Sequence, residues 1–317
     1  MKLHTSTSDF KEIIEAVAED MNLLPFQVEK DYYVSLMLKE IAKINDLTIV
    51  FKGGTSLSKC YDIIERFSED IGLAVKFEGN QVSYGNRKKL KEGLKKVISN
   101  LGFEFINESE VESNKEYNRY EVGYQKLFGS SDIMLDHILI ETIIVYKPYP
   151  CEKHQVSNYI TKYLERNHNQ DLIIKYDLEP FEMTIQTINR TLIDKVFAIC
   201  DYHLLKNYTR HSRHIYDIHK IWTGESLDKH VVRHIIKDVI RDRQLYGTQN
   251  VSCNPSQKPI NILWEIYNQS VYKRDYDDIT SSFIYKTVTY ERAIESIREI
   301  IESNLIPEIV EDYRSGQ

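Results

Sequence analysis

A glycine pair is the first candidate for a functional role in this sequence. Gly53 and Gly54 follow an apolar run and precede two hydroxyl residues, Thr55 and Ser56. Glycine lets a backbone come close to an anion, and the start of a following helix favours negative charge. Thr55 and Ser56 could cap that helix and hydrogen-bond a phosphate. The pattern indicates a phosphate-holding turn, although two glycines and a serine before a helix more often form only a tight turn with an N-cap.

An acidic residue, Asp70, stands at the start of the next apolar run. Residues two apart on a strand face the same side, so a carboxylate at position 72 would project beside Asp70. Two such carboxylates would bind one or two Mg²⁺ ions and organise a triphosphate for in-line transfer. Position 72 is Gly72, so the predicted metal site lacks one ligand. We expect Glu141, which is costly to bury in its apolar run unless paired or metal-bound, to supply the third carboxylate, and Asp136 to face the opposite side.

Short elements must position these residues. Residues 47–51 predict a buried strand, and the glycine turn leads from it into a helix predicted over 55–66. Further strands are predicted over 71–77, 133–146 and, at an edge, 176–187, and helices over 9–20, 26–44, 190–207 and 211–222. We therefore expect an α+β fold, with a small mixed β-sheet core and flanking helices in residues 1–187 and an all-helical domain in residues 188–317.

Composition bounds the class of protein. The 317 residues carry a net charge of −7, with 42% hydrophobic and 28% charged residues, which is typical of a soluble globular protein and gives no global electrostatic case for nucleic acid. The chain has no long apolar run and no evident signal peptide, so we expect no membrane span. Four scattered cysteines fit a reducing cytoplasm. Basic residues of the C-terminal half predict local contact with a polyanion, at Arg210, Arg213, Lys220, Arg233, Lys237, Arg241 and Arg243.

The chain resembles the AbiEii/AbiGii-type nucleotidyltransferase toxins, a branch of the polymerase-beta-like nucleotidyltransferase superfamily. The resemblance lies chiefly in two stretches, GGTSLS at residues 53–58 and RFSEDI at residues 66–71. Three further segments agree in order and spacing, namely EKDY at 29–32, RTLIDK at 190–195 and the stretch from Arg213 to Asp217. The likeness extends over about residues 24–221, and beyond it the chain is similar only in being helical.

The resemblance implies the nucleotidyltransferase core of this family and a toxin of a type IV toxin–antitoxin or phage-defence system. Such a protein would transfer a nucleotide from an NTP to an acceptor such as tRNA, using Mg²⁺, and would have a cognate antitoxin. The resemblance implies that Gly53, Gly54, Thr55 and Ser56 contact the nucleotide phosphates. It implies that Asp70 and Glu141 bind the metal. Lys195 would neutralise phosphate charge, and Asp217 would help to organise the site. Ser68 corresponds to a serine at which some relatives are modified by their antitoxin.

Several alternatives stay open. Gly72 departs from the family's D-x-D pattern, which predicts weak or no transfer. The chain could be a silent relative, a substituted version of an active toxin, or a protein in which Glu69 replaces the missing ligand. Taken alone, Lys195 would be a surface lysine and Asp217 would pair with Arg213 one helical turn away. A non-catalytic nucleotide- or partner-binding module and a small-molecule nucleotidyltransferase are the competing functions.

Overall fold

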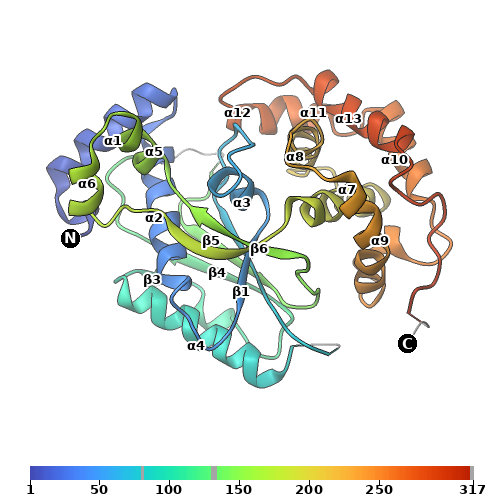
Figure 1. The fold of residues 1–317 in the computed structure, drawn as a ribbon, viewed down its shortest axis with the longest axis horizontal. Coiled ribbons are helices and arrows are strands. Elements are labelled where there is room, and N and C mark those ends of the chain that lie inside the picture. Colours follow the sequence, from blue (N-terminus) through green and yellow to red (C-terminus); the bar gives the residue numbers. More distant parts are fainter. Residues whose placement is uncertain (80–81, 130–133, 315–317) are drawn as a thin grey trace. The chain divides into compact units, whose positions relative to one another are not determined.

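The computed structural model describes residues 1–79, 82–129 and 134–314 and contains two compact units (Figure 1). The sheet unit comprises Met1–Asp62 and Phe67–Ile185, and the helical unit comprises Ile63–Arg66 and Gln186–Gln317. A mixed sheet with flanking helices, followed in the chain by a helical half, confirms the predicted α+β class. The division into domains at residues 1–187 and 188–317 stays a prediction.

A mixed sheet forms the centre of the sheet unit. Its described strands lie in the order β3-β4-β5-β2-β1-β7-β6. They are β1 (Ile49–Lys52), β2 (Asp70–Val75), β3 (Glu104–Phe105), β4 (Tyr117–Gly123), β5 (Ile138–Ile143), β6 (Cys151–Val156) and β7 (Phe181–Gln186). β2 runs antiparallel to β1 and parallel to β5, so it lies in the interior of the sheet between them. The strand that begins with Asp70 is thus held on both sides.

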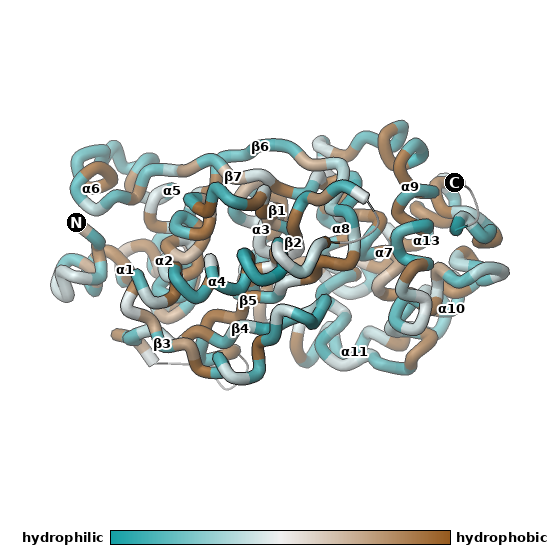
Figure 2. Tube along the Cα trace, turned by 90° about the horizontal axis from the view of Figure 1, so that it is seen from below, coloured by the Kyte–Doolittle hydropathy of each residue, from teal (hydrophilic) through white to brown (hydrophobic). Residues whose placement is uncertain are grey.

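Two strand predictions need correction. The segment predicted as an edge strand over residues 176–187 contains β7, which lies inside the sheet between β1 and β6. The edge position belongs to β6, whose polar residues are largely exposed and hydrophilic along the tube (Figure 2). The strand predicted over 133–146 is the shorter β5, and residue 133 lies outside the described residues. Strand order depends on partners distant in sequence, which local periodicity does not report.

Helix α2 (Pro25–Ile41) is largely buried and contacts α1, α4, α5 and β5. Proline at its first position and the Gln27 side chain, which accepts a hydrogen bond from Leu24 N at 2.9 Å, favour its start. The other helices of this unit are α1 (Thr7–Met21), α3 (Gly54–Lys59), α4 (Tyr84–Asn100), α5 (Tyr159–Arg166) and α6 (Gln170–Lys175), with short 3₁₀ turns at Leu3–Thr5 and Glu108–Glu110.

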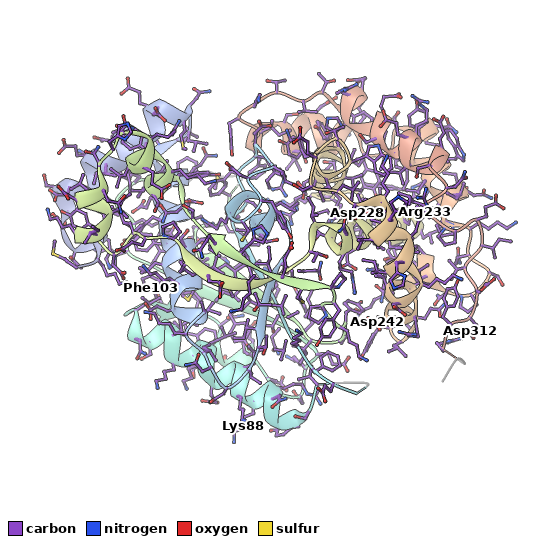
Figure 3. All side chains as sticks on the ribbon, viewed as in Figure 1. Lys88, Phe103, Asp228, Arg233, Asp242 and Asp312 are labelled. Atoms are coloured by element: carbon purple, nitrogen blue, oxygen red, sulfur yellow. The ribbon has the colours of Figure 1, made fainter. Side chains whose placement is uncertain are left out.

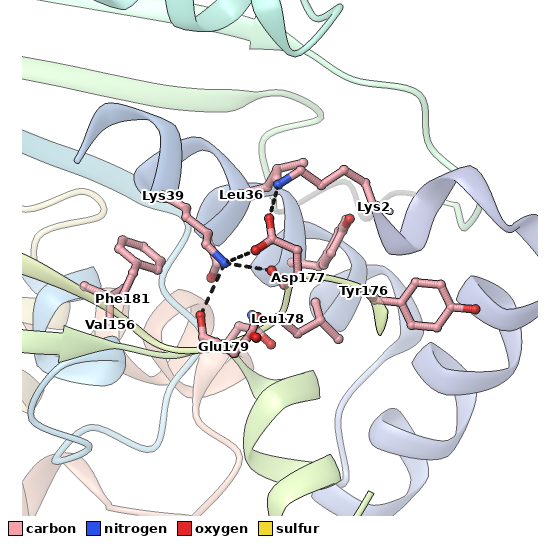
Figure 4. Close-up of a pocket in the computed structure, with 12 residues that line it drawn as sticks. Lys2, Leu36, Lys39, Val156, Tyr176, Asp177, Leu178, Glu179 and Phe181 are labelled. Atoms are coloured by element: carbon pink, nitrogen blue, oxygen red, sulfur yellow. Dashed lines mark hydrogen bonds and ion pairs between the residues drawn. The ribbon is translucent and has the colours of Figure 1, made fainter. Parts of the chain in front are cut away.

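A small pocket beside α2 is closed by ion pairs (Figure 4). Lys2 and Lys39 both reach the Asp177 carboxylate, at 2.6 and 2.7 Å. Burial alone would raise the pKa of Asp177, but hydrogen bonds and charge from the two lysines lower it to about 2. The pocket volume of about 20 Å³ has room for about one water molecule. This ion-pair network therefore has a structural role.

The helical unit is built from longer helices after β7. They are α7 (Ile188–Leu204), α8 (Arg213–Trp222), α9 (Lys229–Gln244), α10 (Pro259–Gln269) and α13 (Tyr290–Glu302), with short pieces α11 (Lys273–Asp275), α12 (Ser281–Phe283), a 3₁₀ turn at Val251–Cys253 and a π-helical turn at Tyr276–Thr280. Within the described ranges, none of the helices combines the length and hydrophobicity needed to cross a lipid bilayer.

The helix predicted over residues 55–66 ends at Lys59, so its predicted length is wrong. Residues Ile63–Arg66 instead run as an extended strap that belongs to the helical unit. Glu65 N donates to Tyr216 Oη at 3.0 Å, and Tyr285 N donates to Glu65 O at 3.0 Å. These bonds, together with the burial of Ile64 and Arg66, outweigh the helical periodicity of the strap.

Candidate active site

The glycine turn connects β1 to α3 and begins in a backbone conformation suited to glycine. Gly53 has φ 91° and ψ −164°, a region that is essentially restricted to this residue type. Ser56 Oγ donates to Gly53 O at 2.8 Å and so holds the turn from within. Gly53 and Gly54 are half-buried, whereas Thr55 and Ser56 are buried. The part of the turn that is open to a ligand is its glycine backbone.

Thr55 joins this turn to the start of β2. Its hydroxyl donates to Asp70 O at 2.5 Å and lies 2.9 Å from Ser68 Oγ. The turn and the first residue of β2 are thus in direct contact. The hydroxyl groups of Thr55 and Ser56 are engaged with protein atoms and stabilise the turn. Their contact with phosphate stays a prediction.

Asp70, Gly72 and Glu141 lie on one face of the sheet. In the parallel ladder of β2 and β5, Asp70 is beside Leu139 and Gly72 is beside Glu141. Laterally paired residues point to the same side of a sheet, as do residues two apart on one strand. Asp70 and Glu141 are half-buried, so this face is open to solvent. The structure therefore brings together the two carboxylates that the sequence predicts as metal ligands.

Tyr117 of β4 contacts one member of this carboxylate pair, Glu141. Its hydroxyl donates to Glu141 Oε1, and Arg119 of the same strand is paired laterally with Glu141. Burial raises the pKa of Tyr117 above its usual range, the hydrogen bond and charge of Glu141 raise it further, and the charge of Asp70 adds to them. Both carboxylates thus act on one hydroxyl group. The sequence offered no signal for Tyr117, because its role depends on the pairing of β4 with β5.

The backbone of Gly72 is packed closely against the neighbouring strand, which leaves no room for a side chain. A Cβ atom at this position would lie 2.8 Å from the backbone oxygen of Lys52, the residue paired with Gly72 across β1 and β2. An ordinary contact begins at about 3.4 Å, so any side chain there must push the strands apart. Gly72→Asp is therefore no simple restoration of a second metal ligand. The sequence could not reveal this, since the close approach depends on strand register.

The donor set suits a Mg²⁺ ion that is shared with substrate. Among the residues that the structure describes, no three His, Cys, Asp or Glu side chains converge as an all-protein metal cage. Mg²⁺ prefers oxygen ligands and is often held by one or two carboxylates together with substrate phosphates and water. Asp70 and Glu141, on neighbouring strands and facing one side, fit that requirement. Their role as ligands stays a prediction.

A buried ion triad in the helical unit contains the other two predicted residues. Arg66 binds both carboxylate oxygens of Asp217 at 2.7 Å, and Lys195 Nζ donates to Asp217 at 2.6 Å. Asp217 is fully buried and Lys195 is 7% exposed. Burial alone would raise the pKa of Asp217, but the charges of Arg66 and Lys195 hold it far below its usual range. Burial also lowers the pKa of Lys195, and the charge of Asp217 opposes that effect.

The surroundings of Lys195 and Asp217 differ from those expected for each residue taken alone. Lys195 is buried and ion-paired, and is no snorkelling surface lysine. The strongest partner of Asp217 is Arg66 from the strap, a residue of the RFSEDI stretch to which the sequence assigned no role. Since 151 positions separate the two residues, only the fold could identify the pair.

Glu69 does not replace the missing ligand in this structure. Its carboxylate accepts a hydrogen bond from Lys30 of α2, and both side chains are buried. Burial raises the pKa of Glu69, and the charge of Lys30 opposes that effect. Glu69, which lies one residue before β2, is thus paired with a lysine of α2.

Several basic residues predicted to contact a polyanion are neutralised within the helical unit. Ion pairs engage three of them, in Arg243–Asp201, Lys220–Glu65 and Arg241–Asp238. In the sheet unit, α4 carries exposed lysines that no ion pair within the described residues engages, at Lys88, Lys89 and Lys96. Lys88 points away from the sheet (Figure 3). Exposed basic side chains thus lie on α4 as well as on the helical unit, where Arg210, Arg233 and Lys237 are exposed.

Comparison with known proteins identifies the family to which the chain is similar. A model of the family described as "Nucleotidyl transferase AbiEii toxin, Type IV TA system" matches residues 37–303. None of the curated proteins compared with the chain matches it. Among solved structures, the nucleotidyltransferase toxin MenT4 from Mycobacterium tuberculosis is similar at 14% identity and a TM-score of 0.48, covering 92% of this chain and 90% of its own. JHP933 from Helicobacter pylori is similar at 16% identity and a TM-score of 0.42, covering 87% and 94%.

Proposed function

The chain belongs to the AbiEii family of nucleotidyltransferase toxins of type IV toxin–antitoxin systems, and we propose that it transfers a nucleotide from an NTP to tRNA in the cytoplasm. Membership makes the protein a nucleotidyltransferase that uses an NTP and a divalent metal and has an antitoxin partner. The observation that supports the site is the placement of Asp70 and Glu141 on one sheet face, beside the glycine turn.

In this proposal the backbone of Gly53 and Gly54 contacts the phosphates, and Asp70 and Glu141 would hold Mg²⁺. When bound, the metal ion would supply positive charge beside the triphosphate and the attacking hydroxyl. An acceptor hydroxyl oxygen bonds to the α-phosphorus while the bond from that phosphorus to the leaving pyrophosphate breaks, and the hydroxyl proton passes to water. For Lys195 we propose neutralisation of phosphate charge, and for Asp217 the orientation of the Lys195 ammonium group, with which it forms an ion pair.

Because position 72 is a glycine, we expect the transfer reaction to be slow. Losing one of two metal ligands should cost several kcal/mol of transition-state stabilisation, or roughly a hundredfold in rate. The same observation favours a second candidate function, a nucleotide-binding relative that has kept the fold without catalysis. The close contact between Gly72 and Lys52 is consistent with both, because the strands are packed around a glycine.

A labelled-NTP transfer assay on the full chain tests the proposal. Each α-labelled NTP is incubated with Mg²⁺ and total tRNA, and label on the RNA is expected for at least one nucleotide. Asp70→Asn should reduce transfer by about a hundredfold or more. Asp62→Asn is the matched control, because Asp62 is an exposed carboxylate with a positive φ that asparagine also tolerates.

The outcomes separate the candidate functions. Label on RNA that is lost with Asp70→Asn but kept with Asp62→Asn supports tRNA transfer. Label on protein or on a small molecule would refute the proposed acceptor. If no acceptor is labelled while calorimetry detects NTP binding without Mg²⁺, the non-catalytic candidate is correct. Gly72→Asp is a poor test, since its side chain disturbs β1 in addition to supplying a carboxylate.

We further propose Ser68 as the position at which an antitoxin acts. Ser68 is half-buried, and its hydroxyl oxygen lies 2.9 Å from Thr55 Oγ1, beside the glycine turn. A phosphoryl or nucleotidyl group on Ser68 would break this contact and add negative charge next to Asp70. Ser68→Glu should therefore reduce transfer much more than Ser68→Ala. Equal activity of both variants would contradict the proposal.

A further inference from the structure

Three consecutive charged residues lie buried in the centre of the sheet unit, on α2. Glu29, Lys30 and Asp31 are 1%, 2% and 4% exposed. Burying a charge is costly unless it is paired and hydrogen-bonded, so each of them needs a partner. Glu29 accepts hydrogen bonds from Leu127 N and Phe128 N, at 2.6 and 3.0 Å. The side-chain partners of Lys30 and Asp31 are Glu69 and Lys59, which lie on the segments that carry the candidate site.

Lys30 joins the starts of the two strands that carry the carboxylates. Its ammonium group donates to Glu69, the residue immediately before Asp70 at the start of β2. It also donates to Leu135 O at 2.6 Å, three residues before β5 begins. β5 carries Glu141. One buried side chain thus fixes both strands at the end where Asp70 lies.

Asp31 holds the helix that follows the glycine turn. Its carboxylate accepts a hydrogen bond at 2.5 Å from Lys59, the last residue of α3, and another at 2.9 Å from Tyr159 N. Lys59 also donates to Ser35 Oγ of α2 at 2.6 Å. Because α3 begins at Gly54 and has only six residues, fixing its last residue also fixes the turn.

We propose that Lys30 and Asp31 are positioning residues of the nucleotidyltransferase site. The Lys30–Glu69 pair sets the positions of Asp70 and Glu141, and the Asp31–Lys59 pair sets the glycine turn. This inference rests on the proposed function. It assigns the two halves of the site, the carboxylates and the glycine turn, to two adjacent positioning residues of one helix. Small displacements of reacting groups cost large factors in rate, so such remote anchors have catalytic consequences.

The competing explanation is that both pairs serve stability alone. Buried ion pairs are weak evidence for that role, because well-packed apolar replacements are often neutral or stabilising. A third lysine of α2 provides a matched comparison. Lys39 pairs with Asp177, a residue that precedes β7 and lines the small pocket beside α2 (Figure 4). Lys39→Met removes an α2 ion pair without touching the anchors of the site.

The experiment compares Lys30→Met, Asp31→Asn and Lys39→Met with the wild-type full chain. Amide hydrogen exchange reports local positions independently of activity. We expect faster exchange of residues 70–75 in Lys30→Met, faster exchange of residues 53–59 in Asp31→Asn, and neither in Lys39→Met. In the transfer assay, Lys30→Met should raise the Mg²⁺ concentration for half-maximal rate by about 10-fold or more. Asp31→Asn should raise the KM for NTP by about 10-fold or more. Substitutions of residues that orient metal ligands commonly have effects of this size.

Each result decides between the alternatives. Uniform changes in exchange, with a lower active fraction but unchanged KM and Mg²⁺ dependence, would overturn the inference. If either variant fails to fold, Lys30→Arg and Asp31→Glu retain the charge, and these should restore the wild-type pattern only partly if geometry matters. If the wild-type chain transfers nothing, the proposed function fails by itself, and the exchange pattern still decides whether the two pairs position the strands and the turn.

Discussion

Replacing Gly72 by alanine tests the packing of β1 against β2. The added Cβ would lie 2.8 Å from Lys52 O, about 0.6 Å inside an ordinary contact of about 3.4 Å. The atom it meets is backbone, which cannot rotate away as a side chain could. Lys52 and Gly72 form the last pair of the antiparallel ladder, so the strand ends can separate to relieve part of the overlap.

Overpacking by a methyl group costs about 1–3 kcal/mol in well-packed sites. Relief at the end of the ladder places Gly72→Ala in the lower half of this range, at about 1–2 kcal/mol. The melting temperature should therefore fall by about 2–8 °C, since 1 kcal/mol corresponds to about 2–4 °C in units of this size. Calorimetry on the purified chain measures this change directly.

Gly85→Ala is the control for the general effect of removing a glycine. Gly85 lies in the first turn of α4, and a Cβ there would have its nearest contact at 3.9 Å, with Ser83 Oγ. Alanine should stabilise this position by about 0.4–1 kcal/mol through the unfolded chain. If Gly72→Ala is as stable as Gly85→Ala, the strands are not packed around a glycine, and Gly72→Asp becomes a valid restoration of the second ligand.

Three further changes address other parts of the structure. Asp217→Asn leaves Arg66 and Lys195 buried without their anion, and denaturant unfolding should show a loss of about 3–5 kcal/mol; a loss below about 1 kcal/mol would contradict the triad. Gly53→Ala should cost about 1–3 kcal/mol through backbone strain alone, because a Cβ there meets no atom within 4 Å. Burial, with nearby positive charge, lowers the pKa of His219 from 6.5 to about 4, so its stabilising effect is fully present above pH 6.5 and is lost as pH falls toward 4. The free energy of unfolding should drop by up to about 1.4 kcal/mol per pH unit in that window, and His219→Gln should flatten this dependence.

The features of the site that depend on local patterns were predictable from sequence. The glycine turn follows from residue type, and the shared face of Asp70 and position 72 follows from the two-residue period of a strand. Those patterns identify which residues of one strand lie on the same face, but they do not identify which residues of other strands lie beside them. That is why Glu141 could be suggested as a ligand while its contact with Tyr117 could not.

The features that depend on distant partners were not predictable. Helical periodicity predicts the helix α2, yet it does not reveal that Lys30 meets Glu69 or that Asp31 meets Lys59. The strap at Ile63–Arg66 has the local signals of a helix and is extended because of its bonds to Tyr216 and Asp217. Tertiary contacts override local propensity at these positions.

The strap also determines how the polypeptide can be divided. Because Ile63–Arg66 belongs to the helical unit, that unit is discontinuous in sequence, and a cut near residue 187 does not separate two complete pieces. A fragment of residues 188–317 would lack Arg66, so Asp217 would lose a cationic partner and retain its ion pair with Lys195. A fragment of residues 1–187 would expose Ile64, which is buried in the intact chain. Truncation, split-reporter and fragment-complementation designs should therefore supply the strap with the C-terminal piece, as a linked peptide or by circular permutation.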